Sequence, residues 1–155
     1  MLVMAGQVAG CIGLLTVKEF HPNVVPYDDI TRKLAVSLGL NCYNFTLAPK
    51  DDFLLCVHGR DIVKDIPEVA INIHPCLYKF KGKDPVGQLL ASGERMASVG
   101  AHRMTSKIDE GEVLAEEFID IGDSKTRTEV YNLLYPLYPI VILKALRRVG
   151  CSFRK

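Results

Sequence analysis

Asn72 and His74 have the types and spacing that suit acyl-group chemistry. They lie in an alternating stretch, 69–73, that predicts a short buried strand ending at Pro75, because proline cannot donate to a β-ladder. Side chains two positions apart on a strand point to the same face. An amide that donates hydrogen bonds and an imidazole that carries a proton together meet the needs of acyl transfer. At the carboxyl end of a strand in an open α/β sheet, both would lie where such sheets bind ligands.

A longer pattern surrounds these two residues. Asn-x-His-Pro spans 72–75, Gly-x-x-Pro spans 82–85, and His-x-Met-x-x-x-x-Asp-x-Gly spans 102–111. In this order the three motifs resemble the folate-dependent formyltransferase family. That family includes glycinamide ribonucleotide transformylase, methionyl-tRNA formyltransferase and the amino-sugar N-formyltransferases. The resemblance is dense over 53–116 and thin before it.

The resemblance implies a catalytic group formed by Asn72, His74 and Asp109, which match the family's Asn, His and Asp. His102 stands where the family also carries a histidine, and we assign it a supporting role. Taken singly, each residue has an ordinary structural explanation, as a turn cap, a strand end or a turn residue. Their joint occurrence favours a formyltransferase site.

The resemblance also implies a formyl donor, N10-formyltetrahydrofolate, and a loop that holds its pterin ring. The matching loop residues are Arg60, Asp61, Ile62 and Val63, directly after an apolar run at 53–57. A pterin offers amide-like donors and acceptors that loop backbone can pair in a flat slot. Without the resemblance, an exposed loop would be the simpler interpretation. The reaction needs no metal, and the sequence has no metal-ligand spacing.

Strand and helix patterns alternate in the first half of the chain. We expect strands at 2–5, 24–25, 41–45 and 53–57, and helices at 11–20 and 30–38. The alternation predicts an α/β protein with a mostly parallel central sheet and helices on both faces. With the resemblance, this becomes a Rossmann-like formyltransferase fold.

The second half begins with a helix capped by Asp84 and ending near Gly93, followed by strands at 99–104 and 112–119. A capping box at 126–129 opens a long C-terminal helix. Pro136 and Pro139 should kink or break that helix, because each removes a backbone donor.

Three glycines, Gly6, Gly10 and Gly13, follow the first strand but lack the Gly-x-Gly-x-x-Gly spacing. Close packing of a strand-to-helix turn is the favoured explanation. An anion site at this turn stays open as a second hypothesis.

The 155 residues, 48% of them hydrophobic, suffice for a single catalytic domain over 1–155. The net charge of +1 gives no basic field, which disfavours nucleic acid and membrane surfaces as partners. Five cysteines without a Cys-x-x-Cys pair suggest a reducing cytoplasm. The apolar start lacks a basic n-region and is shorter than the roughly 20 residues of a bilayer span, so we expect a buried strand and helix there.

These features predict an enzyme that formylates a small-molecule amine. An amino-sugar nucleotide comes slightly ahead of glycinamide ribonucleotide and of methionyl-tRNA, for which the chain shows no added tRNA-binding domain. The alternatives are a formyltetrahydrofolate hydrolase and a non-catalytic folate- or protein-binding relative. A homodimer contact through the apolar C-terminal segments is also open.

Overall fold

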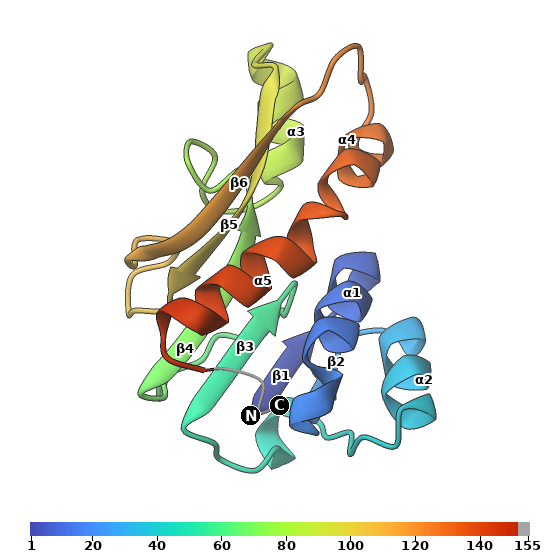
Figure 1. The fold of residues 1–155 in the computed structure, drawn as a ribbon, viewed down its shortest axis with the longest axis vertical. Helices are drawn as coiled ribbons and strands as arrows, with labels where there is room; N and C mark the ends of the chain where they lie inside the picture. The colour runs from blue at the N-terminus through green and yellow to red at the C-terminus, as the bar shows by residue number, and fades with distance from the viewer. Residues whose placement is uncertain (152–155) are drawn as a thin grey trace.

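The computed structural model describes residues 1–151 and is built on one six-stranded sheet (Figure 1). The strand order is β2-β1-β3-β4-β5-β6. The first four strands in this order are parallel to one another. β5 pairs antiparallel with β4, and β6 pairs antiparallel with β5. The strands are β1 Leu2–Ala5, β2 Asn23–Pro26, β3 Phe53–Val57, β4 Val69–Pro75, β5 Met96–Arg103 and β6 Val113–Asp120. The expected mostly parallel α/β sheet is therefore confirmed.

The helices connect these strands and follow them. They are α1 Gln7–Val17, α2 Asp29–Ser37, α3 Pro85–Ser92, α4 Arg127–Leu134 and α5 Leu137–Arg148, with short 3-10 helices at Lys18–Phe20 and Phe45–Leu47. In Figure 1, α5 runs diagonally across the sheet, where it packs on β5 and β6 and touches α1. No helix of the described residues is long and apolar enough to cross a bilayer.

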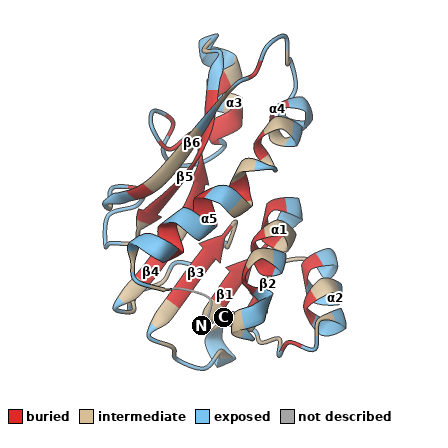
Figure 2. Cartoon of the chain, in the orientation of Figure 1, coloured by how far each residue is buried: buried red, intermediate tan, exposed pale blue. Residues whose placement is uncertain are grey.

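The two faces of the sheet are covered differently. The larger hydrophobic cluster receives buried side chains from all five helices of residues 1–151, and we call this the helix side. The opposite face, the loop side, carries a smaller cluster that includes Met4, Leu54 and Cys56. Phe45 and Val63, from irregular segments and a 3-10 turn, pack against it. Figure 2 shows the sheet buried between these layers, with exposed outer faces on α1 and α5.

Three expectations need correction. The five α-helices of residues 1–151 all pack on the helix side, so α-helices do not cover both faces of the sheet. Segment 41–45 is not a strand: it makes one isolated bridge, between Val24 and Cys42, and then turns into the 3-10 helix Phe45–Leu47. Asn44 is the N-cap of this 3-10 helix, so the chain turns away from β2 soon after the bridge. The first helix begins at Gln7 and not at residue 11.

The C-terminal helix breaks once. It ends at Leu134 and resumes at Leu137, on either side of Pro136. Pro139 breaks nothing, because it lies in the first turn of α5, where a backbone N–H has no acceptor within the helix. The capping box at Thr126 is present, with Glu129 as its second member.

Candidate active site

Asn72 and His74 come from the carboxyl end of β4, where they share one face. In the antiparallel ladder Asn72 pairs with His102 of β5, and the Asn72 amide nitrogen lies 3.2 Å from His102 Nε2. His102 Nδ1 donates to the carbonyl oxygen of Arg103 at 2.9 Å, which fixes the orientation of the ring. Strand pairing therefore brings together two side chains that are thirty positions apart in the sequence.

Asp109 joins this group from a turn, where its backbone adopts the left-handed conformation with φ of 57°. Its Oδ1 lies 3.3 Å from His102 Nε2, and its Oδ2 lies 3.7 Å from His74 Nδ1. The backbone N–H of Gly82 donates to Oδ2 at 2.9 Å. The carboxylate thus lies between the two imidazoles.

The charge of Asp109 is held by its neighbours. Burial raises the pKa of this carboxyl, but hydrogen bonds from His102 and the Gly82 amide, and the nearby His74 ring, outweigh burial and lower it to about 2. Asp109 is therefore ionised at neutral pH and attracts positive charge on either histidine.

His74 is buried, and its Nε2 donates to the carbonyl oxygen of Phe80 at 2.9 Å. This bond leaves Nδ1 as the ring atom that faces Asp109. An imidazole held in this way can take up a proton at Nδ1, next to a carboxylate that stabilises the resulting cation.

Two cavities meet at this group, and Asn72 and Gly59 line both of them. The first, of about 410 Å³, is the His74 cavity; its wall includes Gln7, His58, His74, Asp84, Arg127 and Tyr131. The second, of about 230 Å³, is the His102 cavity; its wall includes Asp61, Ile62, Val63, His102, Met104 and Asp109. Asn72 therefore stands where a molecule in one cavity would meet a molecule in the other.

Three of the four predicted cofactor-loop residues, Asp61, Ile62 and Val63, line the His102 cavity. Arg60 does not: it is exposed, and its charge is felt instead by Asp28. The Tyr27 hydroxyl donates to Asp61 Oδ2 at 2.6 Å and so ties this loop to the end of β2. Two of the three loop residues that line this cavity, Ile62 and Val63, are apolar, which suits the flat face of an aromatic ring.

The wall of the His74 cavity also contains five residues that the sequence analysis did not assign to the site: His58, Gln7, Asp84, Arg127 and Tyr131. The Tyr138 hydroxyl lies 2.7 Å from His58 Nε2, and Gln7 Oε1 lies 3.2 Å from His58 Nδ1. Burial, helped by the neighbouring His74, lowers the pKa of His58 to about 4. A signal existed for His58 and Gln7, since each follows the carboxyl end of a parallel strand. No local pattern marked Arg127, which comes from α4.

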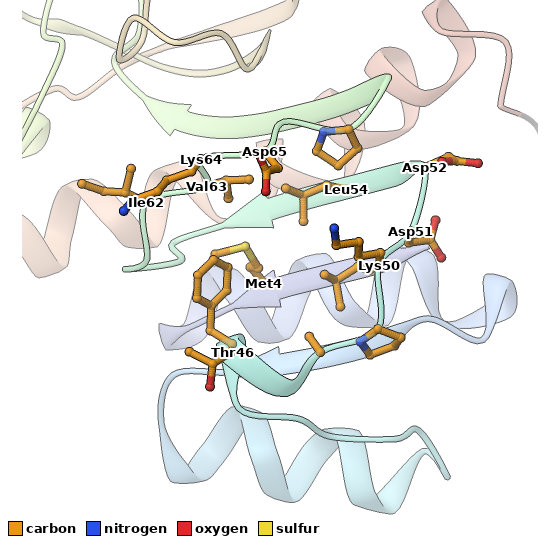
Figure 3. Close-up of a pocket in the computed structure, with 15 residues that line it drawn as sticks. Met4, Thr46, Lys50, Asp51, Asp52, Leu54, Ile62, Val63, Lys64 and Asp65 are labelled. Carbon is orange, nitrogen blue, oxygen red and sulfur yellow. The ribbon is translucent and has the colours of Figure 1, made fainter.

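A third cavity, of about 500 Å³, lies on the loop side (Figure 3). Met4 and Leu54 form its floor between the segment that carries Lys50 and the one that carries Asp65. It shares Ile62 and Val63 with the His102 cavity, and none of the candidate catalytic residues lines it. Within residues 1–151, no three histidine, cysteine, aspartate or glutamate side chains are arranged to hold a metal ion.

Comparison with known proteins gives this geometry a context. The family model described as formyl transferase matches residues 54–146, more than half of the chain. Methionyl-tRNA formyltransferase of Borreliella afzelii (strain PKo) is 23% identical over 146 residues, which cover 88% of this chain and 46% of that protein. The chain thus spans about half the length of this relative.

Two solved structures share the fold. Phosphoribosylglycinamide formyltransferase from Streptococcus pneumoniae TIGR4 has a TM-score of 0.73 and 19% identity, covering 94% of this chain and 97% of that one. The N-formyltransferase from Helicobacter canadensis, in complex with folinic acid and dTDP-3-aminofucose, has a TM-score of 0.78 and 17% identity, covering 96% and 63%. With the matched family model, we conclude that the chain belongs to the folate-dependent formyltransferase family.

Proposed function

We propose that the chain is an N10-formyltetrahydrofolate-dependent formyltransferase that acts on a small-molecule amine, with residues 1–155 working as one catalytic unit. The position of Asn72 carries this proposal, because it lies where the His74 and His102 cavities meet, beside Asp109 and both histidines. Acyl transfer between two bound molecules needs such a meeting point. Five free cysteines among residues 1–151 fit a reducing cytoplasm.

The His102 cavity is our candidate for the donor. Its wall combines apolar Ile62 and Val63 with loop backbone, which suits a flat ring bearing amide-like groups. Binding of folinic acid by the Helicobacter relative supports this choice. When bound there, the donor would supply the formyl group.

The chain's own residues would then act on charge and protons. The Asn72 amide donates toward the negative charge that develops on the acyl oxygen. His74 Nδ1 takes the proton that the attacking amine loses, since Nε2 is held by the Phe80 carbonyl. The same proton would then pass to the donor nitrogen as its bond to the formyl carbon breaks, which releases tetrahydrofolate. Ionised Asp109, 3.7 Å from Nδ1, stabilises the imidazolium.

The His74 cavity is our candidate for the acceptor amine. It is the larger of the two cavities that meet at Asn72, and its wall includes Tyr131, Gln7 and Asp84, whose polar groups could bind sugar hydroxyls. An amino sugar therefore remains our favoured acceptor, ahead of glycinamide ribonucleotide and methionyl-tRNA. The aminofucose nucleotide bound by the Helicobacter relative supports this ranking.

The test is release of tetrahydrofolate from N10-formyltetrahydrofolate, measured with and without a panel of amines. Loss of one oxyanion donor lowers kcat by about 10²–10³-fold in comparable sites, which we expect for Asn72→Ala. His74→Ala should also abolish acceptor-dependent release, while Asn132→Ala, an exposed change on α4, should leave it intact. Release without any amine would indicate a hydrolase. Folate binding without release would indicate a non-catalytic relative.

A further inference from the structure

The first turn of α1 follows the carboxyl end of β1, and Gln7 at its start lines the His74 cavity. In α/β proteins the free N–H groups of such a turn commonly bind a phosphate. Here the Gln7 N–H already donates to the carboxylate Oδ2 of Asp28, at 2.5 Å. The chain's own anion therefore occupies the place of a ligand's anion.

Asp28 is held firmly in that position. Its Oδ1 accepts from the Thr31 N–H at 2.9 Å and caps α2. Burial raises the pKa of Asp28, but the Gln7 and Thr31 hydrogen bonds and the charge of Arg60 outweigh it and lower the pKa overall. A phosphate at the same N–H groups would meet a permanent negative charge.

Arg127, in the described wall of the His74 cavity, is already paired with a carboxylate of the chain. The Arg127 guanidinium forms a two-pronged pair with Asp84, with Nε 2.9 Å from Oδ1 and Nη2 against Oδ2. Asp84 in turn caps α3 by accepting from the Gly87 N–H at 3.1 Å. This bidentate arrangement compensates the charge of Arg127 and fixes its orientation.

Apart from His74, whose Nδ1 faces Asp109, the remaining polar side chains of the wall carry no positive charge. His58 is uncharged at neutral pH, with a pKa of about 4, and Gln7 and Tyr131 offer an amide and a hydroxyl. Lys81 and Lys83 flank Gly82 but are exposed and do not line the cavity. Charged parts of a larger acceptor would have to lie outside, near these lysines.

We propose that the His74 cavity selects an uncharged, hydroxyl-rich amine such as an amino-sugar ring. Asp28 does not line this cavity, but it holds the backbone N–H of Gln7, which does, and we propose that it is the specificity-determining residue that keeps phosphate from that N–H. This proposal rests on the proposed function in one respect: it assumes that the amine bound in the cavity is the formyl acceptor. The exclusion of phosphate is a property of the cavity itself.

The first experiment measures binding of inorganic phosphate by calorimetry to the full chain and to two variants. Asp28→Asn keeps the helix cap, because asparagine caps as well as aspartate, but removes the charge. We expect phosphate to bind this variant about tenfold or more tightly than wild type, a change of about 1.4 kcal/mol. Asp29→Asn, an exposed neighbour in the same turn, should behave as wild type. Asp28→Ser, which also retains a capping oxygen, guards against misfolding of the first variant.

The second experiment compares one amine with and without its phosphate: glycinamide ribonucleotide and the corresponding riboside. Wild type should show a kcat/KM for the riboside at least equal to that for the ribonucleotide. Asp28→Asn should shift the ratio toward the ribonucleotide by about tenfold.

Either of two results would overturn the proposal: tight phosphate binding by wild type that Asp28→Asn does not change, or a wild-type preference for the ribonucleotide. Failure of the proposed function looks different. No formyl transfer to any amine would refute the transferase, while the calorimetry would still decide whether Asp28 excludes phosphate.

Discussion

Nε2 of His102 lies near a hydrogen-bond donor and a hydrogen-bond acceptor. The donor is the Asn72 amide at 3.2 Å, and the acceptor is Asp109 Oδ1 at 3.3 Å. Without a proton, Nε2 accepts from the Asn72 NH₂ group. With a proton, it donates to Asp109, and the Asn72 NH₂ group is free to turn toward the cavity. We therefore propose that His102 is a positioning residue, which would act on the acyl oxygen through Asn72.

This arrangement predicts non-additive effects on rate. His102→Ala should lower kcat, but adding it to Asn72→Ala should lower kcat little further, because the second change removes a partner already lost. Steady-state kinetics of the two single variants and the double variant would measure the coupling. Fully additive effects would show that His102 works independently of Asn72.

His58 should make the protein sensitive to acid. Its pKa is about 4 in the folded state against 6.5 ordinarily, so the unfolded chain binds a proton first as the pH falls. The free energy of unfolding should therefore decrease between pH 6.5 and pH 4, at up to about 1.4 kcal/mol per pH unit. Urea unfolding of wild type and His58→Gln across this range would test it. The difference between the two curves should shrink with acid, and parallel curves would contradict the assignment.

At the scale of elements, the N-terminus of α4 matters because Arg127 and Tyr131 reach the His74 cavity from this helix. Its capping box joins the Thr126 hydroxyl to the Glu129 N–H at 3.2 Å.

We expect Thr126→Ala to reduce the free energy of unfolding by about 1 kcal/mol, the usual effect of losing a cap. Thr128→Ala, an exposed change two residues farther along the same helix, serves as the matched control. It should change the free energy of unfolding by less than about 0.5 kcal/mol. Denaturant midpoints give both values. Equal effects would mean that the cap contributes nothing.

Element prediction succeeded where local chemistry and burial agreed. The continuous apolar run at 53–57 and the four residues at 2–5 are strands with the predicted bounds, because both strands lie inside the sheet. The strand predicted at 41–45 was wrong, because this segment lies beside the edge strand β2 and pairs with it through a single bridge. That outcome depends on a competition between an edge pairing and a turn, which the local pattern does not decide.

Site prediction shows the same division. Asn72, His74, His102 and Asp109 lie together as their motif predicts, although their catalytic roles stay predictions. The place of Arg127 in the cavity wall and the bond of Asp28 to the Gln7 N–H could not be predicted from sequence. Each works through a carboxylate or helix end that only the fold brings near, and a single charged residue in a sequence is usually just solvated.

At the scale of the whole molecule, the helix side should carry the stability and the loop side the binding. Ile142 of α5 is fully buried on the helix side, whereas Ile62 is 75% exposed at the His102 cavity. The same side-chain truncation therefore tests both sides.

Ile142→Ala should lower the free energy of unfolding by about 2–5 kcal/mol, through lost burial and a residual cavity. Ile62→Ala should change it by less than about 0.5 kcal/mol but raise the KM for the formyl donor. Chemical denaturation and donor titration of the two variants would separate these effects. A large loss of stability in Ile62→Ala would show that the loop side is also a structural core.

The uneven covering of the sheet should also affect how fast a ligand binds. A donor that enters the His102 cavity would fit between loops on a face that no α-helix of residues 1–151 covers. Association that requires a conformational change is slower than association with a preformed site. Stopped-flow mixing with folinic acid should then give an observed rate that levels off at high ligand concentration, the signature of a loop that opens before the ligand can enter.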